Sequence, residues 1–227
     1  MAKKVAIITA GGSGTRMGAN TPKQFLLLNN KPLLWYTLKA FFEAFDDISI
    51  TLVLPSDYIS QGKMLVADMG KETSVTLIAG GQTRFHSVKN GIDLLDKESI
   101  VFVHDGVRCL VTPNLIRACY EQAKRLGSAI PAVSATDSIR IADVHSGHSA
   151  IDRNLVKIVQ TPQTFKSELL IRAFNMPYQE SFTDEATVVE YSGEKTFLID
   201  GDYDNLKITR PVDLLVAESI LQKRNQY

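Results

Sequence analysis

Short runs of apolar, β-branched residues alternate with segments in which apolar side chains recur at helical spacing, from residue 4 to residue 133. The strand-like runs span 4–9, 48–55, 74–81, 99–106 and 128–133, and the helical patterns span 32–45, 83–95 and 112–126. Strands apolar on both faces and separated by helices are typical of a parallel sheet covered on both sides. The sequence therefore predicts an α/β fold, with a Rossmann-like, mostly parallel sheet and flanking helices. In such sheets ligands bind beyond the carboxyl ends of the strands.

The alternation stops after residue 134. SIRIAD (138–143) and AIDRNLVKIVQ (150–160) flank the polar VHSGHS, which predicts an extended hairpin with a turn near Ser146-Gly147. A two-stranded arm is only marginally stable by itself. We therefore expect a projecting β-arm that packs on a second copy of the chain, giving a homodimer; a hairpin folded on the chain's own sheet is the alternative.

The remaining segments return to regular patterns, with helices expected at 166–176, 184–191 and 211–224 and a late strand in KTFLID. No repeat or low-complexity linker separates the parts. We expect one domain over 1–227, with the arm inserted at about 136–160.

Composition excludes several classes of function. Of 227 residues, 25 are Lys or Arg and 25 are Asp or Glu, so the net charge of zero gives no basis for nucleic-acid binding. No apolar run reaches the length of a membrane span, and the apolar stretch near residue 5 is too short for a signal peptide. Cys109 and Cys119 have neither CxxC spacing nor a histidine cluster, so we expect reduced thiols in a cytoplasmic protein that binds no membrane.

The glycine-rich loop after the first strand, AGGSGTRMG, matches neither common nucleotide motif. Gly12 and Gly14 fit the first two places of GxGxxG, but Met17 occupies the third, which argues against a nicotinamide-dependent oxidoreductase. The chain also has no GK[ST], so this is not a P-loop.

The same loop still has the groups that a phosphate needs. Gly11, Gly12 and Gly14 leave backbone N–H groups open to phosphate oxygens. Arg16 offers a forked pair of donors, and Lys23 adds a point charge directly after Pro22. The loop therefore predicts a phosphate-binding site of a different kind.

This loop, with the PKQF that follows it, resembles the signature of sugar-phosphate nucleotidyltransferases. The later segments GGQTRFHSV, VHDGVR, DSIR, IDRN, QTPQTF, TDEATVVEY and DNLKITRPVDL come in the order and spacing of the 2-C-methyl-D-erythritol 4-phosphate cytidylyltransferase family. The resemblance covers essentially the whole chain. TDEA and KITRP resemble this family more than the ribitol-5-phosphate cytidylyltransferases, which remain the alternative. One departure is Cys109, where the family usually has proline. Without proline the backbone is less restricted there, which slightly weakens the expectation that Arg108 is oriented as in the family.

The resemblance implies transfer of a cytidylyl group from CTP to a polyol phosphate, with release of pyrophosphate, in non-mevalonate isoprenoid synthesis. Because the attacking phosphate is already ionised near neutral pH, the reaction needs cations placed in advance rather than a strong base. The resemblance assigns Lys23 and Lys207 to the α-phosphate and Arg16 to the triphosphate and leaving group. It implies Mg²⁺ held mainly by phosphate oxygens, with Asp105 as a candidate ligand.

The resemblance also assigns the binding residues. The expected nucleotide-binding residues are Ala10, Gly11, Gly12, Gly14, Gly80, Gly81, Gln82, Ser87, Asp105 and Gly106. The expected acceptor-binding residues are Asp105, Arg108, Ser138, Arg153, Thr161 and Thr183, with Arg153 reaching the partner's active site from the arm. Thr183 is also a candidate cap for the helix that follows, and His104 is expected to support its loop by hydrogen bonding.

A non-catalytic nucleotide-binding module is the alternative from another class. It predicts CTP binding without pyrophosphate release. The presence of Arg16, Lys23 and Lys207 together argues against it, because a binder without catalysis would be free to lose them.

Overall fold

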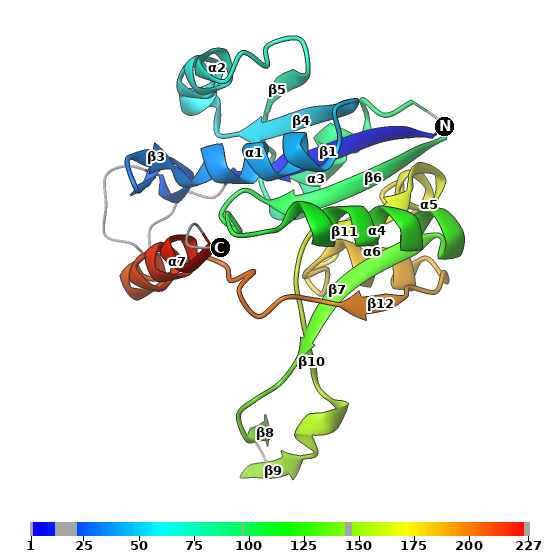
Figure 1. Ribbon diagram of the computed structural model, residues 1–227. Helices are drawn as coiled ribbons and strands as arrows, with labels where there is room; N and C mark the ends of the chain where they lie inside the picture. The colour runs from blue at the N-terminus through cyan, green and yellow to red at the C-terminus, as the bar shows by residue number, and fades with distance from the viewer. Residues whose placement is uncertain (1, 12–21, 97, 144–146, 225–227) are drawn as a thin grey trace.

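The computed structural model describes residues 2–11, 22–96, 98–143 and 147–224. An eight-stranded sheet forms the centre, with the order β10-β7-β11-β6-β1-β4-β5 and β12 paired with β7 (Figure 1). Its strands are β1 (Lys3–Thr9), β4 (Ile48–Leu54), β5 (Val75–Ala79), β6 (Ser99–Asp105), β7 (Ser128–Ser134), β10 (Lys157–Val159), β11 (Gln163–Lys166) and β12 (Leu198–Asp200). Pairing is parallel except at β10 and β11, so the mostly parallel sheet is confirmed.

Two layers of helices cover the sheet because its strands are apolar on both faces. In β1, Ala6 and Ile8 pack into one buried cluster and Ile7 into another, as the two-residue period of a strand requires. The first cluster includes side chains of α1 (Leu33–Ala44), α2 (Ile59–Asp68) and α4 (Pro113–Leu126). The second includes side chains of α3 (Arg84–Ile92), α5 (Ser167–Ala173) and α6 (Glu185–Tyr191).

Several helix ends follow the local sequence signals. Thr112 caps the start of α4, where its hydroxyl accepts the amide of Leu115, and Gly127, with a φ of 95°, ends it. Thr83 caps α3 in the same way. Asp184, not Thr183, caps α6, because its carboxylate accepts the amide of Thr187; the capping role considered for Thr183 is therefore wrong.

The sequence patterns did not predict α2, or β10 and β11 as members of the main sheet. Two further short elements, β2 (Leu27–Leu28) and β3 (Lys31–Pro32), form a small separate sheet, and three-residue 3₁₀ helices occur at η2 (Lys23–Phe25), η3 (Ser56–Tyr58) and η4 (Arg153–Leu155).

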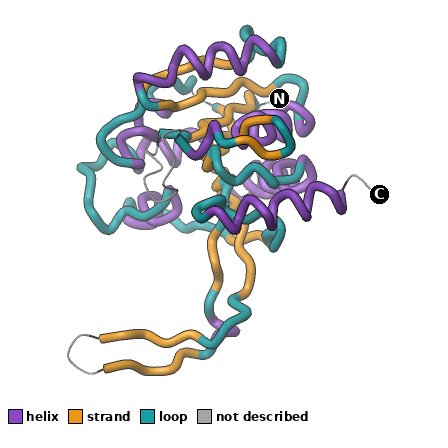
Figure 2. The backbone as a smooth tube through the Cα atoms, turned by 90° about the vertical axis from the view of Figure 1, so that its left-hand side faces the viewer, coloured by secondary structure: helices purple, strands orange, loops and turns teal. Residues whose placement is uncertain are grey.

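The projecting arm is confirmed as a feature of the chain. β8 (Ile139–Asp143) and β9 (Gly147–Ile151) pair with each other in a separate sheet that extends away from the body (Figures 1 and 2). The return strand β10 already pairs with β7, so the projecting part ends before residue 157 and is shorter than expected. Ser146 of the predicted turn lies outside the described residues.

The last helix, α7 (Pro211–Arg224), forms a third apolar cluster with the loop after β6. Leu28, Cys109, Ile208 and Ala217 are buried together there. The amide of Ile208 donates to the Val107 carbonyl at 3.1 Å, which attaches the segment before α7 to the loop after β6. No helix within the described ranges is long and apolar enough to cross a membrane.

Candidate functional site

The carboxyl ends of β1, β4, β5 and β6 lie at one edge of the sheet, here called the carboxyl edge. Thr9 at the end of β1 pairs in register with Asp105 at the end of β6. The Gly106 amide then donates to the Thr9 carbonyl at 2.9 Å. A side chain at Gly106 would bring a Cβ within 2.9 Å of the Ala10 Cβ, so only glycine lets the two loops approach this closely.

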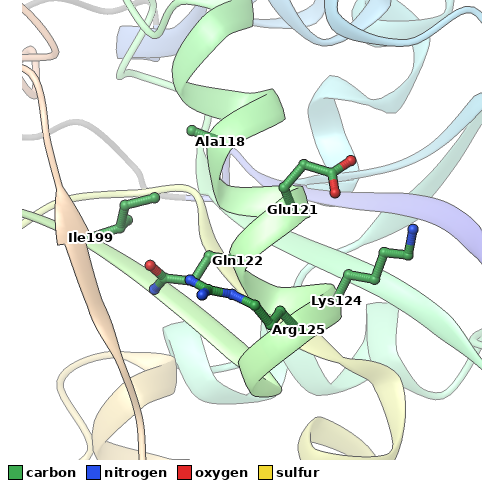
Figure 3. A pocket seen from close by; sticks show the side chains of 6 residues that line it. All are labelled: Ala118, Glu121, Gln122, Lys124, Arg125 and Ile199. Carbon is green, nitrogen blue, oxygen red and sulfur yellow. The ribbon is translucent and has the colours of Figure 1, made fainter.

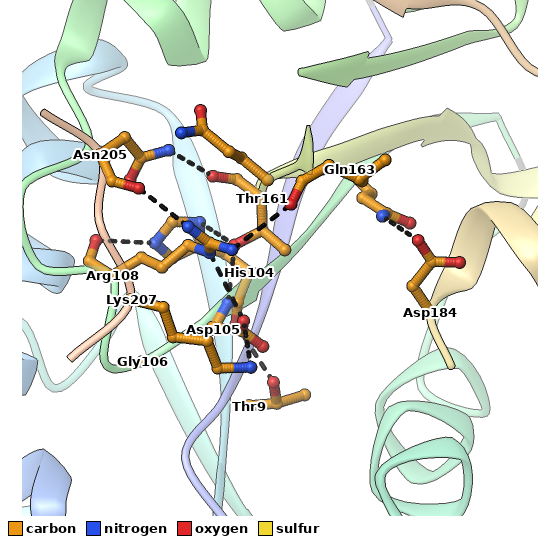
Figure 4. Close-up of polar contacts among 12 residues, drawn as sticks. Thr9, His104, Asp105, Gly106, Arg108, Thr161, Gln163, Asp184, Asn205 and Lys207 are labelled. Carbon is orange, nitrogen blue, oxygen red and sulfur yellow. Dashed lines mark hydrogen bonds and ion pairs between the residues drawn. The ribbon is translucent and has the colours of Figure 1, made fainter. Parts of the chain in front are cut away.

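Three cations surround the buried carboxylate of Asp105, and we call these four residues the Asp105 cluster. The Lys207 ammonium lies 3.0 Å from Asp105 Oδ2, and the Arg108 guanidinium lies 3.6 Å from the same oxygen. Arg84 Nη2 lies 3.3 Å from Oδ1. Figure 4 shows the Lys207 and Arg108 side chains both directed at Asp105. Residues distant in sequence thus meet at the end of β6.

These cations fix the charge of Asp105. Burial alone would raise its pKa, but Arg84, Lys207 and Arg108 hold the pKa of Asp105 well below its usual range. The carboxylate is therefore ionised at every physiological pH. The Lys207 side chain is 44% exposed, so its ammonium is held by the fold and is still accessible to a ligand.

Sequence reasoning missed Arg84 and Glu185. The Arg84 guanidinium makes a forked ion pair with Glu185, with Nη2 at 3.1 Å from Oε2 and Nη1 bonded to Oε1. Burial raises the pKa of Glu185 against the opposing effect of Arg84, whereas Glu185 and Asp105 raise the pKa of Arg84 against the effect of burial. One signal in the sequence could have indicated this pair: Arg84 is a cation in the first turn of a predicted helix, a position that the helix dipole disfavours for cations unless carboxylates lie nearby.

Lys23 and Lys207, the two lysines predicted to act in catalysis, both lie beside the carboxyl edge. Lys207 is attached through the Ile208–Val107 bond and the Asp105 ion pair. Lys23 begins η2, whose next residue, Gln24, is buried and donates from Nε2 to the Ala10 carbonyl at 2.6 Å. Elements from the two ends of the chain are therefore tied to the neighbouring ends of β1 and β6.

Three of the glycines predicted to bind the nucleotide, Gly11, Gly80 and Gly81, lie around Ser87. The Gly81 amide donates to Ser87 Oγ at 3.1 Å, and that hydroxyl donates to the Thr83 carbonyl. A Cβ at Gly80 would lie 3.0 Å from Ser87 Oγ, and one at Gly11 would lie 3.7 Å from it. The loops after β1 and β5 thus meet at one hydroxyl, and Gln82 in the loop after β5 is exposed. Ser87 lies within α3 rather than at its start.

His104 supports the loop after β6 by hydrogen bonding, as expected. It is fully buried, its Nε2 lies 3.2 Å from the Arg108 carbonyl, and its Nδ1 lies 2.9 Å from Thr161 Oγ1. A carbonyl only accepts, so Nε2 carries the proton and Nδ1 accepts the Thr161 hydroxyl. Thr161 in turn accepts the Asp105 amide at 3.1 Å. Two residues predicted to bind the acceptor, Thr161 and Arg108, therefore also organise the loop that carries Asp105.

Arg108 is largely buried despite the replacement of proline by Cys109. Its Nη1 donates to the Asn205 carbonyl at 2.8 Å, and Nη2 lies 3.5 Å from the Val159 carbonyl. Asn205 Nδ2 donates to the Thr161 carbonyl at 2.9 Å. Cys109 fills the third apolar cluster, so packing holds the backbone there.

The buried neutral histidine predicts a specific response to acid. Burial lowers the pKa of His104 from 6.5 to about 4, so the unfolded chain binds this proton first and stability falls as pH decreases from 6.5 to 4. We expect His104 to contribute about 3 kcal/mol to this loss. Urea unfolding over this range, compared with a His104→Gln variant, measures it. The raised pKa of Glu185 acts in the opposite direction in both proteins. Parallel pH curves for the two proteins would contradict the assignment.

The other predicted residues are placed as follows. Ser138 is exposed just before β8, Arg153 is exposed in η4 with its Nη1 donating to the Thr136 carbonyl, and Thr183 is exposed just before α6. Gly12, Gly14 and Arg16 lie outside the described residues. No contact of Ser138, Arg153 or Thr183 with the Asp105 cluster is described within one chain.

Among the residues described at the carboxyl edge, Asp105 is the candidate side-chain ligand for the predicted Mg²⁺. Within the described part of the chain, no group of three or more His, Cys, Asp or Glu side chains could hold a metal ion. Asp105 is the carboxylate at the carboxyl edge, and both of its oxygens already face cations. The described residues therefore supply no protein cage for Mg²⁺, and a cation held by the nucleotide's own phosphates stays a prediction.

A hollow of about 580 Å³ lies elsewhere (Figure 3). It is lined by Ala118, Glu121, Gln122, Lys124, Arg125 and Ile199. The last turns of α4 lead into the amino end of β7, so this hollow lies away from the carboxyl edge. It contains none of the predicted site residues.

Comparisons with known proteins point to one family. The family model for 2-C-methyl-D-erythritol 4-phosphate cytidylyltransferase matches residues 4–223. A protein of that name from Bacteroides fragilis is 40% identical over 218 residues, covering 96% of this chain and 99% of the relative. One from Porphyromonas gingivalis is 43% identical over 220 residues, covering 96% and 98%.

Solved structures show the same fold. The 4-diphosphocytidyl-2C-methyl-D-erythritol synthase from Anaerococcus prevotii superposes with a TM-score of 0.83 at 27% identity, covering 97% of this chain and 99% of that one. The 2-C-methyl-D-erythritol 4-phosphate cytidylyltransferase from Thermus thermophilus gives a TM-score of 0.75 at 27% identity, covering 98% and 100%.

Proposed function

This chain belongs to the 2-C-methyl-D-erythritol 4-phosphate cytidylyltransferase family, and on that premise we propose that its carboxyl edge is where the transfer takes place. The chain is a CTP-dependent nucleotidyltransferase of non-mevalonate isoprenoid synthesis. It joins CTP and 2-C-methyl-D-erythritol 4-phosphate to give 4-diphosphocytidyl-2-C-methyl-D-erythritol and pyrophosphate. The observation that carries the site assignment is the accessible Lys207 ammonium, held 3.0 Å from Asp105 at the end of β6.

In the proposed mechanism, an oxygen of the acceptor phosphate forms a bond to the α-phosphorus of CTP. The bond from that phosphorus to the β-phosphate breaks, and pyrophosphate leaves with the electron pair. Negative charge gathers on the α-phosphate oxygens, where Lys207 and Lys23 stabilise it, while Arg16 binds the leaving group. Because Asp105 holds Lys207 before the nucleotide arrives, little reorganisation is needed.

The loops around Ser87 bind the nucleoside in this proposal. The residues that form this part of the site are Ala10, Gly11, Gly80, Gly81, Gln82 and Gly106, together with Gly12 and Gly14. Glycine at Gly81 is required because a Cβ there would lie 2.4 Å from the His86 Cβ. Asp105 accepts a hydrogen bond from a substrate hydroxyl, and Thr183 contacts the acceptor.

The metal in the proposal is Mg²⁺ bound by phosphate oxygens of CTP, where it would neutralise charge on the phosphates. Asp105 is the described residue that could reach such an ion. No step assigned to Lys23 or Lys207 depends on it.

A homodimer completes the proposed site. Ile141, Leu155 and Ile158 are 55%, 78% and 51% exposed along the arm and its base, an apolar surface that a second chain would cover. Arg153 and Ser138 of that arm would then supply the cation and hydroxyl for the acceptor phosphate in the partner's active site. The two cysteines are free and buried, which supports a cytoplasmic, reducing location.

The direct test is pyrophosphate release by the purified protein with CTP, Mg²⁺ and either 2-C-methyl-D-erythritol 4-phosphate or ribitol 5-phosphate. We expect turnover with the first acceptor to exceed that with the second by at least about 100-fold. Equal use of both would overturn the assignment of the acceptor. CTP binding without pyrophosphate release would favour the non-catalytic module.

The shared active site makes a separate prediction. Arg153→Ala and Lys23→Ala proteins should each lose most activity, but mixed dimers should regain about a quarter to a half of wild-type activity per dimer, because one of the two sites then has both residues. Differently tagged chains, refolded together and purified through both tags, allow the measurement. Absence of recovery in verified mixed dimers would count against exchange of the arm.

A further inference from the structure

Arg84 connects three parts of the site that lie far apart in sequence. It is the first residue of α3, the helix that carries Ser87. Its guanidinium binds Asp105 Oδ1 through Nη2 at 3.3 Å and Nε at 3.4 Å. It also binds both carboxylate oxygens of Glu185, the first residue of α6. One planar group therefore spans the nucleotide loop, the end of β6 and the start of α6.

The buried carboxylate of Glu185 is paired with the Arg84 guanidinium. The Glu185 side chain is 1% exposed, and Arg84 is the cation that pairs with it among the described residues. A buried ion pair is seldom more stabilising than apolar side chains of the same volume, because desolvation offsets the attraction. The forked geometry does fix an orientation, since two parallel hydrogen bonds define both a distance and an angle.

The start of α6 also follows Thr183, the residue to which the proposed function assigns a contact with the acceptor. Thr183 lies two residues before Glu185 and is exposed. Gln163 of β11 binds the same turn from the other side, donating to Asp184 at 2.8 Å and accepting the Ala186 amide at 2.8 Å (Figure 4 shows the first bond). Gln163 fixes this turn relative to the sheet, and Arg84 fixes it relative to Asp105.

We propose that Arg84 is a positioning residue for the acceptor: by holding Glu185 and Asp105 together, it sets the position of Thr183 relative to the reacting phosphates. The inference rests on the proposed function, which assigns Thr183 and Asp105 to the acceptor. Lysine at position 84 would keep the charge but could not form the fork to both carboxylates.

The test uses the full chain with Arg84→Lys, Glu185→Gln and the double substitution. We expect the KM for 2-C-methyl-D-erythritol 4-phosphate to rise about tenfold in each single variant, with the KM for CTP changed by less than about threefold. The double variant should show no further rise, because both substitutions break one interaction. The matched control is Arg172→Lys, which alters an exposed pair with Glu194 and should change neither KM.

A second measurement does not depend on turnover. Amide hydrogen exchange of residues 186–189 should become about tenfold faster in Arg84→Lys than in the wild type. Unchanged KM values with only a lower thermal midpoint would show that the pair stabilises the fold and nothing more, which overturns the proposal. An equal rise in both KM values, or unchanged exchange at α6, also overturns it. Wild-type turnover, measured first, decides the proposed function separately.

Discussion

Replacing Lys207 with alanine should lower kcat by about 100- to 1000-fold, the usual effect of removing one charge-stabilising donor from a transition state. The ammonium is held 3.0 Å from Asp105, at the place where the α-phosphate is proposed to bind. Charge on that phosphate grows as the acceptor attacks, so the interaction is stronger in the transition state than in the ground state. The KM for CTP should therefore change much less than kcat. Pyrophosphate release at saturating concentrations of both substrates provides the measurement.

The fold should tolerate this change. Lys207 is 44% exposed, and Asp105 keeps Arg84 and Arg108 as neighbours, so the free energy of unfolding should fall by no more than about 1 kcal/mol. Lys195→Ala, the same substitution at an exposed position before β12, should change neither kcat nor stability. If Lys207→Ala kept kcat within about threefold of the wild type, the assignment of Lys207 to the α-phosphate would be wrong.

The strand and helix patterns predicted most of the fold because burial on both faces leaves a clear record in the sequence. β4 and β6 are almost wholly buried, and most of their residues are apolar. The pattern failed at α2, where Gly62 weakens the expectation of a helix. The reason for that glycine is tertiary: a Cβ there would lie 2.3 Å from Leu54 Cδ1 and 2.7 Å from Leu77 Cδ2. Local helix propensity cannot predict such close packing of α2 on the sheet.

The candidate site was predictable only in part. Sequence motifs indicated Asp105 and Lys207 one at a time, and the resemblance gave their roles. Spacing could not show that Asp105 and Lys207 form an ion pair, since they lie 102 positions apart in the sequence. Glu185 was missed for a different reason, because an acidic residue in the first turn of a helix is favourable without any partner.

Asp105 is the member of the cluster whose loss we expect to lower stability most. Its carboxylate is buried, and it is the anion that faces both Lys207 and Arg108 among the described residues. Arg84 has Glu185 as a second partner, and Arg108 also donates to the Asn205 carbonyl. Removing the charge of Asp105 therefore leaves Arg108 and Lys207 without a counter-ion while Arg84 keeps one.

Replacing Asp105 with asparagine should lower the free energy of unfolding by about 3 kcal/mol at pH 7, because loss of one partner from a buried ionic cluster leaves the other charges uncompensated. The change keeps the size and shape of the side chain but removes its charge and one acceptor oxygen, so the effect reports the lost interactions with the cations rather than packing. Urea unfolding at pH 7 measures it.

The matched control is Asp202→Asn: its carboxylate lies 3.5 Å from Arg224 but is 34% exposed, so the loss there should stay within about 1 kcal/mol. The difference between the two variants should also shrink as pH falls below 3.8, because the lowered pKa of Asp105 contributes its full stability only above the pKa of the unfolded chain and this stability is lost progressively as pH falls toward the pKa of the folded chain. Equal stability losses in the two variants at pH 7 would mean that the cations at the carboxyl edge are held by their other contacts, and that Asp105 does not organise them.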